Sequence, residues 1–168
     1  MTRAPETQIG PVASEAQLAI DKQYLSQAVA DGATLATGGD EVRLNTPGHY
    51  FAPALFTDVS PKAAVARDEI FGPIAAVLRV PDYDAALAMA NDCEFGLSAG
   101  IVSRDAAKID HFSQNAEAGM IQVNLPTAGM DFHAPFTGRK GSSYGAPEKG
   151  SYCREFFTAA KVVHAGRG

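Results

Sequence analysis

Residues 74–80 read IAAVLRV, an apolar run without clean alternation, as expected of a strand buried on both faces of a parallel sheet. Two further apolar runs follow at 98–102 and 120–124, and patterns typical of helices separate the three runs. The resulting order of strand, helix, strand, helix, strand describes consecutive β-α-β units. Such units strongly prefer right-handed crossovers and a mostly parallel sheet, so the sequence predicts an α/β fold with helices flanking the sheet.

Capping residues locate the predicted helices. Ser14 and Gln17 form a capping box, in which the serine oxygen accepts from one free backbone amide and the glutamine side chain reaches back to another. We therefore expect a helix over residues 15–31. Its apolar face is predicted to contain Leu18, Leu25 and Val29. Asp82 and Asp105 are expected to cap the two helices that separate the later strands.

Shorter elements are expected on both sides of this series. Residues 34–37 and 50–56 are predicted strands, with glycine-containing and proline-containing turns between them. Residues 125–150 are predicted to form a long loop rich in glycine and proline, and its interleaved aromatic residues favour a packed rather than a disordered loop. A final strand is predicted over residues 156–163.

The bulk composition limits the size and the partners of the protein. A chain of 168 residues with 46% hydrophobic residues can bury a sizeable core, and we expect one compact unit. The net charge of -5 disfavours nucleic acid or an anionic membrane surface as the main partner. No apolar run approaches the ~20 residues that span a bilayer, and the polar start of the chain does not resemble a signal peptide. We therefore expect a soluble, cytoplasmic protein.

The cysteines and histidines form no metal-binding pattern. Cys93 and Cys153 are far apart in the sequence and belong to no CxxC motif or Cys/His cluster, so neither a zinc site nor a disulfide framework is predicted. The 4 histidines lack HxxxH or HExxH spacing. We expect no bound metal, and a reducing compartment.

Several short motifs resemble those of the aldehyde dehydrogenase superfamily and follow the family's order. DEIFGPI at residues 68–74 is similar to the family's EIFGP motif. PFTGRKGS at 135–142 is similar to its PFGGxKxSG loop, with Thr137 replacing the first of the paired glycines. Further matches are QIGPV at 8–12, ND and EFGLS within 91–98, and GMIQVN at 119–124. The resemblance covers nearly the whole chain.

The resemblance implies a position within a longer enzyme. Residues 1–155 resemble the C-terminal portion of the family's catalytic domain, and 156–168 resemble its C-terminal oligomerisation strand and tail. The stretches 124–129 and 141–145 are most similar to those of bacterial α-ketoglutaric semialdehyde dehydrogenases. The chain is therefore expected to derive from an oxidoreductase that converts an aldehyde into a carboxylic acid.

The family's chemistry needs groups that the resemblance places upstream of this chain. A cysteine thiolate attacks the aldehyde, hydride passes to NAD or NADP, and water hydrolyses the thioester. The nucleophile, the oxyanion-hole asparagine, the glutamate base and the cofactor domain all precede the matching segment. We therefore expect no catalytic residue in this chain, and no tight binding of NAD or NADP by this chain alone.

Two residues are candidates for cofactor binding. Glu69 matches the family glutamate that hydrogen-bonds the nicotinamide ribose; the alternative is a solvated acid beside Arg67. Phe71 matches the aromatic residue beside the nicotinamide; the alternative is ordinary core packing. Gly72 and Pro73 are expected to shape the turn that presents both side chains.

Three residues are candidates for the substrate pocket. Phe136 matches an aromatic residue that lines the aldehyde tunnel, where an apolar wall restricts water around the reacting carbonyl; core filling is the alternative. Leu125 and Thr127 lie in the loop that lines the same pocket in the family, which makes them candidates for substrate selectivity. Arg139 and Lys140 lack the spacing of a phosphate-binding loop, and a solvated or structural loop is expected there.

Three functional hypotheses follow. The chain is a fragment that is inactive alone, a non-catalytic assembly module, or one half of a split enzyme. The expected partners are accordingly the missing N-terminal half or sister subunits of a homo-oligomer, with neither nucleic acid nor a membrane involved. The edge of the predicted strand at 156–163 could pair with another chain.

Overall fold

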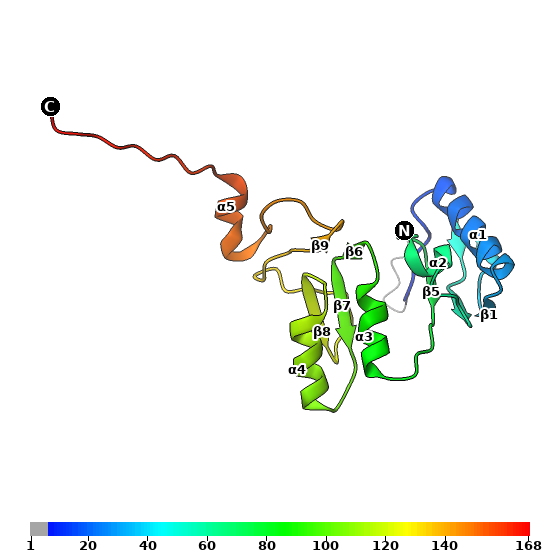
Figure 1. The fold of residues 1–168 in the computed structure, drawn as a ribbon. Coiled ribbons are helices and arrows are strands. Elements are labelled where there is room, and N and C mark those ends of the chain that lie inside the picture. The colour runs from blue at the N-terminus through cyan, green and yellow to red at the C-terminus, as the bar shows by residue number, and fades with distance from the viewer. Residues whose placement is uncertain (1–6) are drawn as a thin grey trace. The chain divides into compact units, whose positions relative to one another are not determined.

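The computed structural model describes residues 7–168, which belong to two compact units, Met1–Arg79 and Val80–Gly168 (Figure 1). We call them the first and the second unit. The single compact unit expected from the length is therefore wrong, since each half of the chain gathers its own strands and helices. The division expected at residue 155 concerns the family's domains and stays a prediction.

A three-stranded sheet forms the framework of the first unit. Its order is β1 (Thr34–Thr37), β4 (Ala54–Thr57), β5 (Ile74–Ala76), with β1 antiparallel and β5 parallel to the central β4. A separate antiparallel pair consists of β2 (Glu41–Val42) and β3 (Tyr50–Phe51). The strand predicted over 50–56 is thus present in two parts, with Pro53 between them, because proline cannot donate to a strand ladder.

Helix α1 (Glu15–Ala30) begins as predicted, since the Ser14 side chain accepts from the Gln17 backbone amide at 3.2 Å. Its buried face differs from the prediction. Leu18 and Ala28 are buried, whereas Val29 is 51% exposed. The core position in the last turn belongs to Ala28, one residue earlier, because the face follows the positions 18, 21, 25 and 28.

The core of the first unit lies between α1, the short helix α2 (Ala64–Arg67) and one face of the sheet (Figure 1). Phe56 of the central strand is 0% exposed. Burying a side chain of this size contributes about 1.5–3 kcal/mol. Other buried members are Leu18, Ala28, Ala33, Phe51, Ala54, Val59, Ala63 and Val65.

The opposite face of this sheet is open within the first unit. Ala75 of β5 is exposed, and Val77, just beyond the strand, is 42% exposed. A shallow hollow on the unit is lined by Ile9, Thr37, Leu55, Gly72 and Ala75, among others. The expectation of a strand over 74–80 buried on both faces is therefore wrong: the ladder covers only Ile74–Ala76, and only one face is covered by α1 and α2.

The second unit contains the other predicted strands and helices. The parallel pair β7 (Ser98–Ile101) and β8 (Met120–Val123) is connected through α4 (Ala106–Asn115), which confirms one β-α-β unit. Helix α3 (Tyr83–Asn91) precedes the pair, and a short antiparallel pair joins β6 (Phe95–Gly96) to β9 (Arg139–Lys140). The α/β class is confirmed, but the three strands expected in one sheet are divided between two sheets, because β5 pairs with β4.

The helices of the second unit begin at the predicted caps. Asp82 accepts from the Ala85 amide at 2.8 Å, and Asp105 accepts from the amides of Ala107 and Lys108 at 3.0 and 3.2 Å. The buried residues of this unit are few: Phe112, Ala116, Ala118 and Met120 are the buried hydrophobic residues among those described.

The C-terminal segment differs from its prediction. A 3-10 turn (Gly150–Tyr152) leads into α5 (Cys153–Phe157), and residues 158–168 are exposed without regular secondary structure (Figure 1). The strand predicted over 156–163 is therefore absent from this single chain. A strand needs a neighbouring strand to satisfy its backbone groups, and no strand pairing in the described part of the chain includes this segment. Pairing with another subunit stays a prediction.

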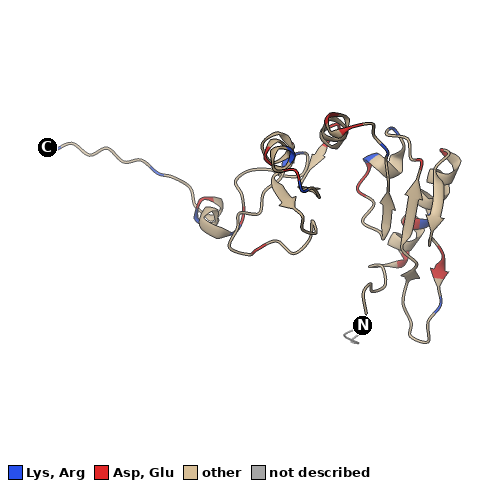
Figure 2. Cartoon of the chain, turned by 90° about the horizontal axis from the view of Figure 1, so that it is seen from below, with Lys and Arg blue, Asp and Glu red and all other residues tan. Residues whose placement is uncertain are grey.

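Acidic and basic residues are scattered along both units, on helices and loops alike (Figure 2). Within residues 7–168, no helix combines the length and the apolar character needed to cross a bilayer.

Candidate functional site

The loop over residues 68–73, called the 68–73 loop, follows α2 and leads into β5. It lies against three polar side chains of α1: Gln17, Asp21 and Tyr24. These positions are spaced i, i+4 and i+7, which places them on one face of a helix. The first unit thus carries a polar stripe beside its apolar core.

The Gln17 side chain connects the helix to the loop. Its Nε2 donates to Asp21 Oδ1 and to the backbone carbonyl of Ile70, both at 2.8 Å. Both partners only accept, which fixes the orientation of the amide. The second half of the predicted capping box is therefore wrong, because this side chain reaches the loop instead of the start of its own helix.

Asp21 is a buried carboxyl group behind the loop. It is 0% exposed, and its Oδ2 has no hydrogen-bond partner among the described residues. The backbone of Gly72 packs directly on the carboxyl group: a Cβ added at Gly72 would lie 2.5 Å from Asp21 Cγ. Only glycine fits this approach, which gives Gly72 the structural role predicted for it.

Tyr24 holds the start of the loop. Its hydroxyl donates to Asp68 Oδ2 at 2.9 Å. This hydrogen bond, with burial and the negative charge of Asp68 in support, raises the pKa of Tyr24 above 10.0. The loop is therefore held at Asp68, Ile70 and Gly72, and the Ile70 side chain also packs against the apolar core.

The two predicted cofactor residues alternate with these anchors and are exposed. Phe71 is 82% exposed, so its alternative role in core packing is wrong for this unit. Its φ of 58° is a left-handed conformation that costs a non-glycine residue about 1–3 kcal/mol and persists only where neighbours enforce it. Glu69, two positions earlier in the chain, is also exposed. An exposed carboxylate can accept from a diol, and an open aromatic face can pack against a planar ring. That Glu69 and Phe71 form a cofactor site stays a prediction.

The second group of predicted site residues belongs to the second unit. Asn124 (φ 54°) directly follows β8, and its side chain bonds both backbone groups of Ser103, accepting from N at 2.9 Å and donating to O at 3.0 Å. The chain beyond it is exposed: Leu125 is 62% exposed, and Thr127 is exposed with its methyl group near Gly100 of β7. Leu125 and Thr127 thus follow the carboxyl end of a parallel strand pair.

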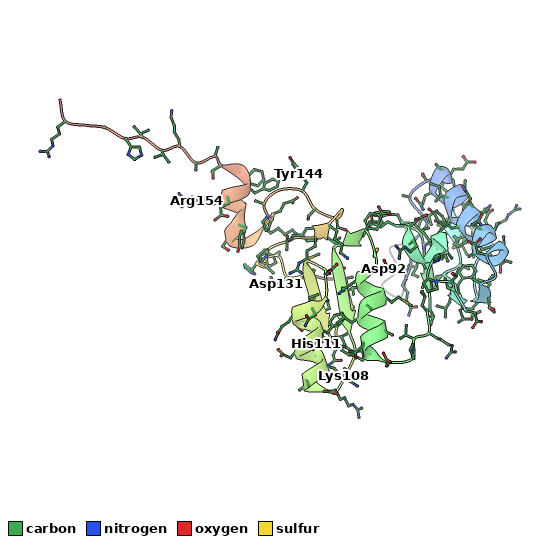
Figure 3. All side chains as sticks on the ribbon, in the orientation of Figure 1. Asp92, Lys108, His111, Asp131, Tyr144 and Arg154 are labelled. Atoms are coloured by element: carbon green, nitrogen blue, oxygen red, sulfur yellow. The ribbon has the colours of Figure 1, made fainter. Side chains whose placement is uncertain are left out.

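Phe136 lies at the other end of this loop. It forms an isolated antiparallel bridge with Glu148, through hydrogen bonds of 3.1 and 3.2 Å. The Lys149 ammonium lies 4.8 Å from the centre of its half-buried ring. Asp131 lies between the two ends of the loop, and Tyr144 lies in the segment that follows Phe136 (Figure 3).

The segment around Lys140 is structural, as predicted. Lys140 Nζ donates to the carbonyl oxygens of Asn91 and Cys93 at 2.6 and 3.0 Å and forms an ion pair of 2.7 Å with Glu117. The ammonium thus joins the ends of α3 and α4 to β9. Its donors are used within the fold, which leaves no open cradle for a phosphate.

Neither cysteine lies in a built catalytic site. Cys93 Sγ accepts from the Phe95 amide at 3.4 Å, and Cys153 is exposed at the start of α5. Among the described residues, no group of three potential metal ligands occurs. The sequence did not predict that Gln17, Asp21 and Tyr24 contact the 68–73 loop. Their i, i+4, i+7 spacing on one helix face is the signal that indicates a shared polar surface.

Comparison with known proteins identifies the class of this fold. The aldehyde dehydrogenase family model matches residues 1–163. The chain belongs to the aldehyde dehydrogenase family, whose members are NAD(P)-dependent oxidoreductases.

Curated relatives include two enzymes named for one semialdehyde. The alpha-ketoglutarate semialdehyde dehydrogenase of Haloferax volcanii is 41% identical over 160 residues, which cover 94% of this chain and 33% of the relative. The alpha-ketoglutaric semialdehyde dehydrogenase of Bacillus subtilis is 37% identical over 157 residues, covering 92% and 32%. The chain spans about a third of the length of these relatives.

Solved structures agree on the fold. Mycobacterium tuberculosis aldehyde dehydrogenase complexed with NAD+ has a TM-score of 0.82 and 32% identity, covering 88% of this chain and 30% of that one. The NAD-dependent aldehyde dehydrogenase of Sinorhizobium meliloti also has a TM-score of 0.82, with 34% identity, covering 87% and 28%.

Proposed function

We propose that this chain supplies the nicotinamide-facing loop and one wall of the aldehyde pocket in an NAD(P)-dependent semialdehyde dehydrogenase. The observation that carries the proposal is the 68–73 loop, which α1 holds at Asp68 and Ile70 while Glu69 and Phe71, on either side of Ile70, remain exposed. The names of the Haloferax and Bacillus relatives support α-ketoglutaric semialdehyde as the substrate class.

The proposal gives a role to each candidate residue. The Glu69 carboxylate accepts hydrogen bonds from the hydroxyl groups of the nicotinamide ribose. The Phe71 ring packs against the nicotinamide and limits its orientation. Bound NAD(P) supplies the acceptor for the hydride that leaves the aldehyde carbon. Leu125, Thr127 and Phe136 form an apolar wall that restricts water around the aldehyde.

An indole at position 71 provides a direct test, because the chain contains no tryptophan. Phe71→Trp is titrated with nicotinamide mononucleotide, the half of the cofactor that this loop would contact. We expect saturable quenching of the indole fluorescence, weakened by Glu69→Gln. Phe157→Trp is the matched control, since Phe157 is 75% exposed on α5, and we expect only linear collisional quenching there. Linear quenching at both positions contradicts the proposal.

The same proposal includes inactivity of the chain by itself. The two free cysteines support this, because neither lies in the loop that carries Glu69 and Phe71, and Cys93 Sγ is engaged by a backbone amide. The purified chain is mixed with α-ketoglutaric semialdehyde and NAD or NADP, and the near-ultraviolet absorbance of the reduced nicotinamide is followed. Turnover comparable to that of a complete relative overturns this part.

We also propose a cytoplasmic location. The two free cysteines support it, because reducing compartments keep thiols unpaired.

A split enzyme is the second candidate, and the open face of the β1-β4-β5 sheet favours it. Sheets with parallel strands normally have both faces covered, yet Val77 and Ile9 are 42% and 54% exposed here. The chain is coexpressed with the upstream part of the Haloferax relative, ending where the match to this chain begins. We expect restored aldehyde oxidation that Glu69→Gln impairs through a raised KM for NAD(P). Copurification without activity contradicts the split enzyme but retains an assembly role.

Assembly with sister subunits rests on the exposed C-terminal segment. Val162 and Val163 are 76% and 75% exposed within a segment that has no regular structure. A homo-oligomer that pairs this segment as a strand would satisfy its backbone groups and place Val162 and Val163 on opposite faces of the shared sheet. Light scattering of the chain and of a version ending at residue 157 tests the idea: a monomer in both cases, at high concentration, rules it out.

A further inference from the structure

The polar stripe of α1 recognises the backbone of the 68–73 loop. The Gln17 amide donates to the carbonyl of Ile70, and the Asp21 carboxyl group packs on the backbone of Gly72. The amide nitrogen also donates to Asp21 Oδ1, so the two side chains act as one unit. Contacts at residues 70 and 72 fix the residue between them.

Phe71 is that residue, and its conformation requires such a constraint. Its φ of 58° is uncommon for an aromatic residue, and its ring is 82% exposed, so packing of the ring does not stabilise the conformation. The stabilising contacts are those of its neighbours. Release of Ile70 and Gly72 would let residue 71 return to the ordinary φ range and move both exposed side chains.

A purely structural role accounts poorly for Asp21. A buried carboxyl group with one oxygen lacking a partner is unfavourable for folding, and an apolar side chain would serve the core better. Proteins break such packing rules mainly at functional sites, where a defined geometry matters more than stability. The stripe therefore serves the geometry of the loop.

We propose that Gln17 and Asp21 are positioning residues that hold the 68–73 loop, and with it Glu69 and Phe71, in the conformation that receives the nicotinamide half of NAD(P). This inference rests on the proposed function for its ligand, whereas the holding of the loop is independent of any ligand.

Backbone order parameters of residues 69–72, measured by NMR on the full chain, test the holding. We expect values near the ~0.85 of rigid backbone in the parent, and below ~0.6 in Gln17→Met and Asp21→Ala. Asp21→Asn keeps the size and the acceptor oxygen and is expected to retain a rigid loop. Gln27→Met is the matched control, because it removes a similar bond to Asp31 on the same helix. Rigid values in both Gln17→Met and Asp21→Ala overturn the proposal.

The functional arm repeats the Gln17 and Gln27 variants in the Phe71→Trp background. We expect Gln17→Met to weaken binding of nicotinamide mononucleotide about tenfold, the effect of losing one hydrogen bond, and Gln27→Met to leave it unchanged. Urea unfolding midpoints monitor global stability, which a positioning role leaves nearly constant in Asp21→Ala. A mobile loop with unchanged binding overturns the positioning role. If the parent Phe71→Trp does not respond to the probe, the proposed function fails, and the order parameters still decide whether the stripe holds the loop.

Discussion

The two loops that carry the predicted site residues are held in different ways. In the 68–73 loop, helix side chains contact every second residue, at Asp68, Ile70 and Gly72. The loop over residues 124–136 is fixed at its ends, through Asn124 and Phe136, and at Met130, whose sulfur accepts from the Gln122 side chain of β8; most of its other residues are exposed. The first loop is thus held at alternate residues by one helix, whereas the second is held at more widely spaced residues and is largely exposed.

The first unit also has the more extensive buried core. The first unit surrounds Phe56 with a contiguous set of buried side chains, whereas the described part of the second unit buries few residues around Phe112. A unit with its own core can keep a binding loop in place without assistance. The difference predicts separate responses to substitution.

Phe56→Ala tests the separation with the largest expected effect. Phe56 is 0% exposed in the central strand, so its removal leaves a cavity and costs about 3–5 kcal/mol. We expect hydrogen exchange to accelerate throughout the first unit while β7 and β8 keep their protection. Equal acceleration in both units would show that they unfold together and would contradict two independent cores.

Gly72→Ala tests the close approach of the 68–73 loop to α1. The added Cβ overlaps the Asp21 carboxyl group, and we expect a loss of about 1–3 kcal/mol in the free energy of unfolding. Combining it with Asp21→Ala makes room for the methyl group, so the double variant is expected to be more stable than the sum of its parts. Additive effects in urea unfolding argue against the contact.

Substitutions of matched N-cap residues, one in each unit, test the independence of the units with a smaller expected loss of stability. Ser14→Ala and Asp105→Ala each remove a side chain that accepts from backbone amides at a helix start, and each costs about 1 kcal/mol. We expect Ser14→Ala to reduce the protection of α1 only, and Asp105→Ala that of α4 only. Residue-resolved hydrogen exchange distinguishes this outcome from a shared loss.

The smallest expected effect concerns pH. The pKa of Tyr24 is raised above 10.0 in the folded chain, chiefly by its hydrogen bond to Asp68. A group whose folded pKa exceeds the unfolded value contributes stability below the unfolded pKa and loses it as pH rises through the folded pKa. We therefore expect the start of the 68–73 loop to loosen above pH 10.0. Asp68→Asn should return the tyrosinate absorbance midpoint toward that value; an unchanged midpoint contradicts the bond.

Local signals in the sequence predicted the local structure well. The caps at Ser14, Asp82 and Asp105 depend on residues a few positions apart, and all three formed as expected. The motif resemblance predicted the family, which the comparisons confirmed, and directed attention to Glu69 and Phe71. Their cofactor roles stay predictions.

Features that depend on distant residues were not predictable from the same signals. The capping-box pattern accounted for Gln17 within its own helix, yet its amide bonds Ile70, which is 53 positions away. Apolar character over 74–80 indicated a strand buried on both faces, but the available helices cover one face only. The segment 156–163 has the composition of a strand without a neighbour to pair with. In each case the local pattern was present in the sequence, but the structure that formed depended on a distant hydrogen-bond partner, a covering helix or a neighbouring strand.

The way α1 holds the backbone of the 68–73 loop has a consequence for protein engineering. Gln17 and Asp21 contact a carbonyl oxygen and a glycine backbone, and neither touches the side chains at positions 69 and 71 through any hydrogen bond in the described chain. The residues at those two positions can therefore be exchanged in a library while the backbone that displays them stays the same. Single codon changes at positions 69 and 71 can therefore alter the exposed chemistry of this loop without a new way of folding it.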